Sequence, residues 1–205
     1  MASAFTLGAT RSGVVRTMLI NKSVILAAGA SERLGVPKAL IQAGGMTLIE
    51  RVALILNEVG LSVNIVTRLS LVDSIRELIP YAKIIVNPNP EHGRTGSLQC
   101  ALGIIGDGPL IMAPVDRPGF SKSTLELLCQ KDETACPIRK ERGGHPIAIS
   151  SKDIGAILRA EPDTPLRDII TPRRIEVEDP HLHLNVDTRE DVELLLKVVS
   201  DLDNH

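Results

Sequence analysis

The sequence predicts a single α/β domain: a three-layer α/β/α sandwich with a mostly parallel, Rossmann-like sheet. Short runs of branched apolar residues alternate along the chain with segments of helical periodicity. Strands that are separated by helices return in the same direction, which makes them parallel. The chain has 205 residues, enough for one well-buried core, and no linker divides it. We therefore expect one domain over 18–205.

The first predicted strand, at 24–26, leads into a loop of unusual composition. The strand is a short run of branched apolar residues, typical of a strand buried on both faces. The residues at 27–31 are all small, and Gly29 can adopt dihedral angles closed to other residues, so the backbone can approach a ligand. Arg33 and Lys38 add two positive charges, and Pro37 stiffens the loop. The pattern predicts a phosphate-binding loop.

A plain strand-to-helix turn with two solvated cations is the alternative interpretation of this loop. The stiffening at Gly35 and Pro37 argues against it. The loop has neither the glycine-lysine spacing of ATPase phosphate loops nor the three-glycine spacing of dehydrogenases. A nucleotide is still the expected ligand, but we expect it to be bound differently from the nucleotides of ATPases and dehydrogenases.

Further elements follow in alternation. Thr47 and Glu50 form a predicted capping box for a helix that ends near Asn57. The next elements are expected to be a strand at 62–67, a helix at 70–79, a strand at 83–86, a helix at 97–105 capped by Ser97, a strand at 110–115 and a helix from Ser121 to about 130.

The last third of the chain departs from this alternation. Strands at 134–139 and 145–149 flank a charged turn and predict a hairpin. A short helix at 166–170 and a short strand at 174–178 follow. Thr188 and Asp191 then indicate the start of a final helix, so part of the acidity there serves helix initiation.

Polar residues are expected at the carboxyl edge of the sheet, where parallel sheets of this type bind ligands. Gly93, Gly96 and Ser97 follow the strand at 83–86 and are predicted to line the base and ribose side of the crevice. Asp116 ends the strand at 110–115, and Asp187 precedes the final helix. Mg²⁺ on a nucleotide needs only one or two protein carboxylates, so we predict that these two aspartates hold it. Turn formation at Asp116 is the alternative.

Composition excludes several function classes. The net charge is −2 and the pI about 6.2, so there is no basic surface for nucleic acid or for an anionic membrane. Three cysteines without paired spacing suit a reducing cytoplasm, and no apolar run is long enough to span a bilayer. Residues 1–17 are expected to be a disordered or upstream-start extension.

These motifs resemble those of the molybdenum-cofactor nucleotidyltransferases, which share a glycosyltransferase-A-like fold. The resemblance rests on five segments: Leu26-Ala-Ala-Gly-Ala-Ser-Glu-Arg-Leu-Gly-Val-Pro-Lys38, Gly93-Arg-Thr-Gly-Ser-Leu98, Val115-Asp-Arg-Pro118, Gly144-His-Pro146 and Asn185-Val-Asp-Thr-Arg-Glu-Asp191. The cytidylyltransferase branch is most similar, because of Ala28 and the Gly-His-Pro segment. Leu34, Arg189 and the stretch at 165–168 depart from the family pattern.

The resemblance implies transfer of a nucleoside monophosphate from a triphosphate, CTP before GTP, to a phosphate-bearing acceptor such as molybdopterin, with release of pyrophosphate. It implies Mg²⁺ on Asp116 and Asp187, and catalysis by Arg33, Lys38 and Asp116. Substrate contacts would fall to Arg117 and His145; from the sequence alone His145 is equally well an ordinary loop histidine. A transient contact with an apo-molybdoenzyme or its chaperone is also implied. The nucleotide itself is expected to contact Leu26, Ala27, Ala28, Gly29, Ala30, Ser31, Arg33, Lys38, Gly93 and Ser97.

Three alternatives stay open at this stage. The same chemistry could use GTP, or a sugar or alcohol phosphate as acceptor. A nucleotide-sensing domain could have kept the fold and lost the reaction, although a sensor has no use for a pair of metal-binding acids. A dehydrogenase is disfavoured by the missing glycine motif.

Overall fold

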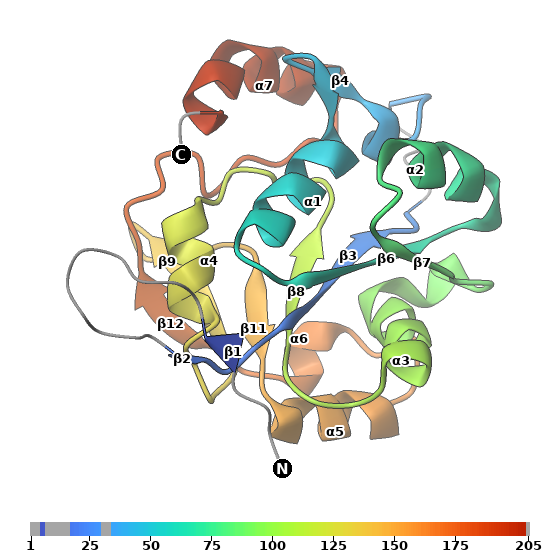
Figure 1. Cartoon of the computed structure of the whole chain (residues 1–205), viewed down its shortest axis with the longest axis vertical. Helices are drawn as coiled ribbons and strands as arrows, with labels where there is room; N and C mark the ends of the chain where they lie inside the picture. Colours follow the sequence, from blue (N-terminus) through green and yellow to red (C-terminus); the bar gives the residue numbers. More distant parts are fainter. Residues whose placement is uncertain (1–4, 7–16, 30–33, 204–205) are drawn as a thin grey trace.

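The computed structural model describes residues 5–6, 17–29 and 34–203 (Figure 1). Within this part of the chain, eight strands form one sheet in the order β10-β9-β11-β8-β3-β6-β7, with β12 paired to β9. These strands are β3 (Lys22–Ala27), β6 (Ser62–Thr67), β7 (Lys83–Val86), β8 (Leu110–Pro114), β9 (Ala135–Arg139), β10 (Arg142–Gly143), β11 (Ile147–Ile149) and β12 (Arg173–Glu176).

The sheet is mostly parallel, as predicted. Strands β8, β3, β6 and β7 run parallel to one another, and β12 runs parallel to β9. Strand β11 is antiparallel to both β8 and β9, which joins the two parallel parts. Two small strand pairs lie outside the sheet: β1 (Phe5–Thr6) with β2 (Thr17–Met18), and β4 (Gln42–Ala43) with β5 (Met46–Thr47).

Helices cover both faces of the sheet and complete the three layers (Figure 1). They are α1 (Leu48–Glu58), α2 (Val72–Leu78), α3 (Gly93–Ile105), α4 (Lys122–Leu128), α5 (Ser151–Arg159), α6 (Leu166–Ile169) and α7 (Arg189–Leu202), with three short 3₁₀ turns, η1 (Lys38–Leu40), η2 (Leu69–Leu71) and η3 (Pro90–His92). Side chains of α1, α2, α4 and α7 share one apolar cluster, and those of α3, α5 and α6 share the other.

Strand β3 is buried on both faces. Val24 and Ile25 are each 0% exposed, and they belong to the two different apolar clusters. Successive side chains of a strand point to opposite faces, so a continuous apolar run is what a central strand requires. This confirms the interpretation of the run at 24–26.

Helix starts were predicted well where a cap residue is present. Thr47 accepts a hydrogen bond from the Glu50 amide and the capping box is complete, and Thr188 caps α7 in the same way with Asp191. Ser121 caps α4. The helix expected at 70–79 is instead a 3₁₀ turn, η2, followed by the shorter α2.

The antiparallel pairing predicted for the strands at 134–139 and 145–149 is present, because β9 and β11 are antiparallel neighbours in the sheet. The structure adds the short β10, which pairs with β9 directly after the turn at Lys140 and Glu141. Lys140 and Glu141 both have positive φ, which lets the chain reverse within two residues. Helix α5, which begins after the cap Ser150, was not predicted.

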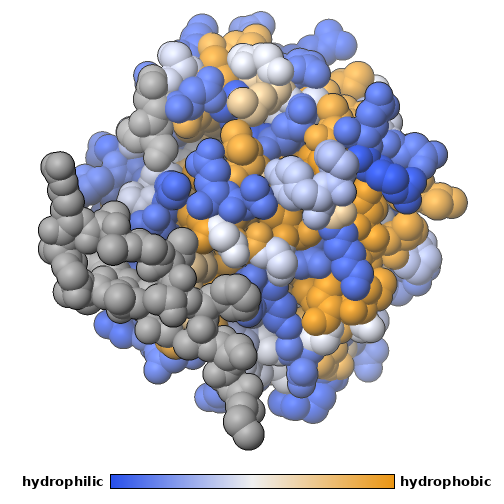
Figure 2. Space-filling model, in the orientation of Figure 1, coloured by the Kyte–Doolittle hydropathy of each residue, from blue (hydrophilic) through white to orange (hydrophobic). Residues whose placement is uncertain are grey.

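The surface of the described residues is ordinary for a chain of small net charge. On the face shown in Figure 2, hydrophilic residues cover much of the surface and apolar residues lie between them. No helix in the described part of the chain is long and apolar enough to cross a bilayer.

Candidate active site

The site lies at the carboxyl edge of the parallel strands, where three segments meet. Strand β3 ends at Ala27 and is followed by Ala28 and Gly29, and β8 ends at Pro114, two residues before Asp116. The amide of Val115 donates to the carbonyl of Leu26 over 3.1 Å, which ties the two strand ends together. The amide of Val186 donates to the Asp116 carbonyl over 3.0 Å, and this bond brings Asp187 next to Asp116.

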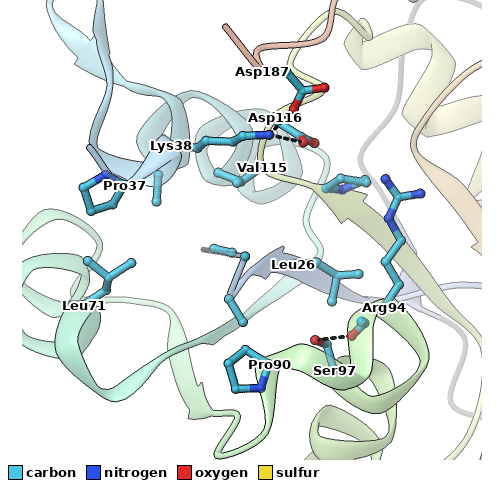
Figure 3. Close-up of a pocket in the computed structure, with 16 residues that line it drawn as sticks. Leu26, Pro37, Lys38, Leu71, Pro90, Arg94, Ser97, Val115, Asp116 and Asp187 are labelled. Atoms are coloured by element: carbon cyan, nitrogen blue, oxygen red, sulfur yellow. Dashed lines mark hydrogen bonds and ion pairs between the residues drawn. The ribbon is translucent and has the colours of Figure 1, made fainter. Parts of the chain in front are cut away.

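Lys38 joins the two aspartates. It begins the turn η1 directly after Pro37, and its Nζ lies 3.0 Å from Oδ2 of Asp116 and also bonds to Oδ1 of Asp187 (Figure 3). The Lys38 and Asp116 side chains are each 19% exposed. The predicted convergence of Lys38, Asp116 and Asp187 is therefore present in the structure.

The charges of this triad stabilise one another. Burial by itself would lower the pKa of Lys38, but the hydrogen bonds to Asp187 and Asp116 outweigh it and the pKa is raised. The hydrogen bond from Lys38 lowers the pKa of Asp187, against the effect of burial, and a second bond from Asn185 lowers it further. The ammonium group of Lys38 and the carboxylate of Asp187 are thus held in their charged forms at neutral pH.

The donor set fits a divalent cation that also binds phosphates. Oδ1 of Asp116 and Oδ1 of Asn185 are buried and have no hydrogen-bond partner. No group of three or more His, Cys, Asp or Glu side chains among the described residues is arranged to hold a metal alone. Mg²⁺ typically takes one or two carboxylates, with phosphate oxygens and waters completing its shell, so two aspartates are sufficient.

A cavity of about 360 Å³ opens beside this triad. Figure 3 shows Lys38, Asp116 and Asp187 at one end, and Pro90 and Ser97 at the other. The lining consists of Leu26, Ala27, Ala28, Gly29, Pro37, Lys38, Ala39, Leu71, Pro90, Gly93, Arg94, Ser97, Pro114, Val115, Asp116 and Asp187. No aromatic ring lines it in the described part of the chain, as the low aromatic content predicts.

Gly29 lines the cavity without an unusual backbone conformation. Its φ is outside the left-handed region, whereas Gly35 and Gly93 have φ near +70°. A Cβ added at Gly29 would meet no atom within 4 Å. The described residues thus leave room for a Cβ at Gly29, and Gly29 does not use the left-handed dihedral angles that glycine allows.

Ser97 lines the cavity but does not cap α3. The helix begins at Gly93, four residues earlier than expected, so Ser97 is inside its second turn. Its Oγ donates to the Gly93 carbonyl over 2.8 Å and accepts from the Asn87 side chain over 3.1 Å. Because a hydroxyl oxygen has two lone pairs, Ser97 can still accept one more hydrogen bond.

Arg117 directly follows Asp116, and His145 lies within reach of the charges of Arg94 and Arg117, but neither Arg117 nor His145 lines the cavity. Nε of Arg117 and Nδ1 of His145 are buried without a partner. Burial, followed by the charges of Arg94 and Arg117, lowers the pKa of His145 to about 3, so its imidazole is neutral. Burial also lowers the pKa of Arg117.

The predicted residues and the residues at the cavity do not coincide completely. Ala30, Ser31 and Arg33, predicted to bind the triphosphate, lie outside the described residues. Arg94 and Leu71 line the cavity, but sequence reasoning missed them. The signal for Arg94 was its position after Gly93, in a loop already placed at the edge of the sheet.

Comparison with known proteins identifies the family of this chain. The family model of the MobA-like NTP transferase domain matches residues 23–178, a range that contains Lys38, Asp116 and His145 and ends before Asp187. No curated protein matches the sequence.

Solved structures share the fold over most of this chain. A homologue of Mycobacterium tuberculosis Rv0371c from Mycobacterium sp. strain JC1 is 26% identical, with a TM-score of 0.73 over 88% of this chain and 97% of that one. Rv0371c from M. tuberculosis H37Rv in complex with manganese is 20% identical, with a TM-score of 0.71 over 87% of this chain and 98% of that one.

A third structure is the molybdopterin-guanine dinucleotide biosynthesis protein A from Archaeoglobus fulgidus. It is 19% identical, with a TM-score of 0.67 over 88% of this chain and 99% of that one. The family match covers most of the chain and includes two of the three residues that converge at the edge of the sheet. The chain belongs to the family of MobA-like NTP transferase domains.

Proposed function

We propose that this protein is a Mg²⁺-dependent nucleotidyltransferase that transfers CMP from CTP to the phosphate of an acceptor and releases pyrophosphate. The observation that carries the proposal is the meeting of Lys38, Asp116 and Asp187 beside a cavity whose floor is the small-residue end of β3. A cation, two carboxylates and an accessible backbone are what a metal-bound triphosphate requires.

The reaction needs positioning more than acid-base chemistry. An oxygen of the acceptor phosphate attacks the α-phosphorus and forms a new P–O bond, while the bond between the α-phosphorus and the bridging oxygen breaks. The leaving pyrophosphate takes the bonding electron pair. Because the acceptor phosphate is already ionised, no side chain has to remove a proton.

Each residue of the triad then has one task. Asp116 and Asp187 would hold the metal ion, which supplies charge neutralisation at the phosphates when bound. Lys38 binds phosphate oxygens on the pyrophosphate side, and Arg33 is proposed to act beside it. Support for a divalent metal comes from the buried, unpartnered Oδ1 of Asp116 and from the manganese complex of Rv0371c.

The base is proposed to be read by hydrogen bonds, because no aromatic ring is present in the described lining to stack on it. The remaining lone pair of Ser97 can accept from an exocyclic amino group. Cytosine, guanine and adenine carry such a group, and uracil does not, so UTP should be a poor substrate. The motif resemblance favours CTP as the nucleotide substrate, and GTP is the alternative.

Molybdopterin is the proposed acceptor. The resemblance of the five motifs supports it, as does the fold shared with a molybdopterin-guanine dinucleotide biosynthesis protein. Its terminal phosphate is the kind of nucleophile that the reaction requires.

Incubation with Mg²⁺, purified molybdopterin and each of CTP, GTP, ATP and UTP tests the proposal. Pyrophosphate release and the product mass are measured together. We expect release with CTP only when acceptor is present, and a product heavier by one CMP unit. Binding of a triphosphate without any release, over acceptors that include sugar and alcohol phosphates, would instead indicate a nucleotide sensor.

A further inference from the structure

A buried acid outside the cavity is not used by the reaction described so far. Asp179 is 6% exposed and lies in the segment between β12 and α7. No ion pair in the described part of the chain includes it, and its Oδ2 accepts a hydrogen bond from the Ser121 amide over 2.9 Å. Burial of an ionisable side chain is costly unless the side chain is hydrogen-bonded, so this bond is what allows Asp179 to be enclosed.

The amide that Asp179 binds belongs to the start of a helix. Ser121 is the N-cap of α4, and its hydroxyl accepts from the Thr124 amide over 3.2 Å. The amide of the cap residue itself has no partner inside the helix. Asp179 supplies that partner from another part of the chain, where a carboxyl group is also favoured by the helix dipole. The bond therefore joins the start of α4 to the segment that leads from β12 to α7 (Figure 1).

We call residues 177–187 the strap, because they run alongside the loop at 116–121 in the opposite direction. At one end, the Val186 amide donates to the Asp116 carbonyl over 3.0 Å. At the other end, Asp179 binds Ser121. Between the two bonds the segments touch: a Cβ added at Gly119 would lie 1.8 Å from the carbonyl oxygen of His181. The loop and the strap are thus fastened at both ends and in contact in the middle.

Other bonds of the strap do not reach this loop. The amides of Leu182 and Leu184 donate to carbonyls within the strap. Arg139, at the end of β9, donates from its side chain to the carbonyl of Pro180 over 3.0 Å and ties the strap to the sheet instead. The Asp179 side chain therefore fixes the far end of the strap to the loop.

We propose that Asp179 is a positioning residue for the metal site: it holds the strap against the loop and so sets the separation between the Asp116 and Asp187 carboxyl groups. Asp116 begins the loop and Asp187 ends the strap, so the relative position of the two segments is that of the two proposed metal ligands. This inference rests on the proposed function and adds a residue outside the cavity to the same site.

The demands of the metal explain why such a fastening is needed. Mg²⁺ takes its ligands at about 2.0 to 2.1 Å in nearly ideal octahedral geometry, so a small displacement of one carboxylate weakens binding. Residues that orient metal ligands from outside typically contribute about tenfold or more to metal affinity. Asp187 lies directly after the bond between Val186 and Asp116, and a strap that can shift at its far end puts strain on that bond.

Two measurements on the full chain test the proposal. Amide hydrogen exchange, followed by NMR without metal, compares Val186 with Ile25 in the centre of β3. Electron paramagnetic resonance gives the Mn²⁺ affinity, with and without the α,β-methylene analogue of CTP. Asp179→Ala removes the acceptor, and Asp179→Asn keeps an oxygen that can accept from Ser121.

Thr134→Val is the matched control. Thr134 is buried, and its Oγ1 accepts from the Ser150 amide over 3.0 Å, so this variant also loses a buried hydrogen bond. Thr134 directly precedes β9, whose first residue lies level with the start of β8. It is therefore at the edge of the sheet opposite to Asp116.

Asp179→Ala should speed exchange at Val186 by about tenfold relative to Ile25, as expected for the loss of a buried hydrogen bond that closes the strap locally. Its Mn²⁺ affinity should fall by about tenfold. Asp179→Asn should stay within about threefold of the wild type in both measurements. Thr134→Val should change exchange at Val186 and Ile25 by the same factor and leave the Mn²⁺ affinity unchanged. If Asp179→Ala does not fold, Asp179→Glu, which keeps the acid but lengthens the side chain, should lower the Mn²⁺ affinity at least about threefold.

Three results would overturn the inference. They are unchanged relative exchange at Val186 in Asp179→Ala, faster exchange there with unchanged Mn²⁺ affinity, and an equal loss of Mn²⁺ affinity in Thr134→Val, which would assign the effect to overall stability. Failure of the proposed function looks different. A wild type that binds neither Mn²⁺ nor the triphosphate analogue would refute the proposed function and the metal site together. A wild type that binds both but releases no pyrophosphate would refute the reaction and leave the role of Asp179 supported.

Discussion

Nζ of Lys38 lies 3.0 Å from Oδ2 of Asp116, and these two residues follow the neighbouring parallel strands β3 and β8. The same nitrogen bonds to Asp187, which precedes α7. One ammonium group therefore bridges two carboxylates. This arrangement reduces the repulsion between two acids that lie close together, and it places a cation where phosphates are proposed to bind.

Substitution of Lys38 by Met should abolish most turnover and leave the fold intact. The loss should be about 100-fold or more, as for other groups that stabilise charge in the transition state. Asp116→Asn should have an effect of similar size. Pyrophosphate release measures turnover, and circular dichroism with a thermal melt checks folding. Lys152→Met, at an exposed position on α5, is the control. Normal turnover in either site variant would remove that residue from the mechanism.

Lys38→Met should also bind Mn²⁺ more tightly than the wild type when no nucleotide is present. The ammonium group competes with any dication for Asp116 and Asp187, and its removal leaves both carboxylates available. The gain should be roughly three- to tenfold, because these partly exposed charges are screened by solvent. Electron paramagnetic resonance of free Mn²⁺ gives the affinity. Asp187→Asn should bind more weakly than the wild type, and unchanged affinity in both variants would show that the triad is not the metal site.

Two glycines near the site should respond very differently to alanine. A Cβ at Gly119 would lie 1.8 Å from the carbonyl oxygen of His181, so Gly119→Ala must separate the loop after Asp116 from the segment that leads to Asp187. We expect a loss of about 2 kcal/mol or more in the free energy of unfolding, as for overpacked sites. Urea denaturation measures it.

Gly29→Ala should instead leave stability within about 0.5 kcal/mol of the wild type, since a Cβ there meets no atom within 4 Å. It should weaken binding of a triphosphate analogue, because the added methyl group lies in the cavity where the backbone is proposed to contact phosphates. Normal binding by this variant would contradict that role for the end of β3.

The central part of the site could be located from the sequence, because the end of each parallel strand can be recognised from a few neighbouring residues. Lys38 and Asp116 each follow a strand, and strands of one direction end at one edge. Asp187 was identified by exclusion, since Asp191 already served the cap of the final helix. The structure agrees: Asp191 holds the amides of Asp187 and Thr188, and the Asp187 carboxylate points to Lys38.

What the sequence left undetermined depends on where helices begin. A serine hydroxyl can either cap a helix from outside or donate to a backbone carbonyl from inside one, so its presence does not decide between the two positions. The hydroxyl of Ser97 does the second: it donates to the Gly93 carbonyl from inside α3. Because the helix was expected to begin at Ser97 and not at Gly93, Arg94 was assigned to a loop. The direction of its side chain toward the cavity could not be derived from that assignment. Helix α5 carried a cap signal of its own, since Ser150 accepts from the Asp153 amide.

The pH dependence of stability should carry a contribution from His145. Its pKa is lowered to about 3 in the folded protein, by burial and by the charges of Arg94 and Arg117, from an ordinary value of 6.5. As the pH falls below about 6.5, the unfolded chain takes up a proton that the folded protein does not, so stability falls. The slope approaches about 1.4 kcal/mol per pH unit, and the total reaches at most roughly 4 to 5 kcal/mol near pH 3.

Urea denaturation of the wild type and of His145→Asn between pH 7.5 and 4, taken in steps of about half a unit, isolates this contribution from that of the carboxylates. The variant should lose less stability than the wild type over this range, and the difference between the two curves should grow as the pH falls. His145→Gln provides a second comparison should the asparagine variant be too unstable. The His145 ring resonances should stay those of a neutral imidazole to about pH 4. Parallel stability curves, or a ring that titrates near its ordinary pKa, would show that His145 accepts a proton freely and that burial and the charges of Arg94 and Arg117 do not act on it.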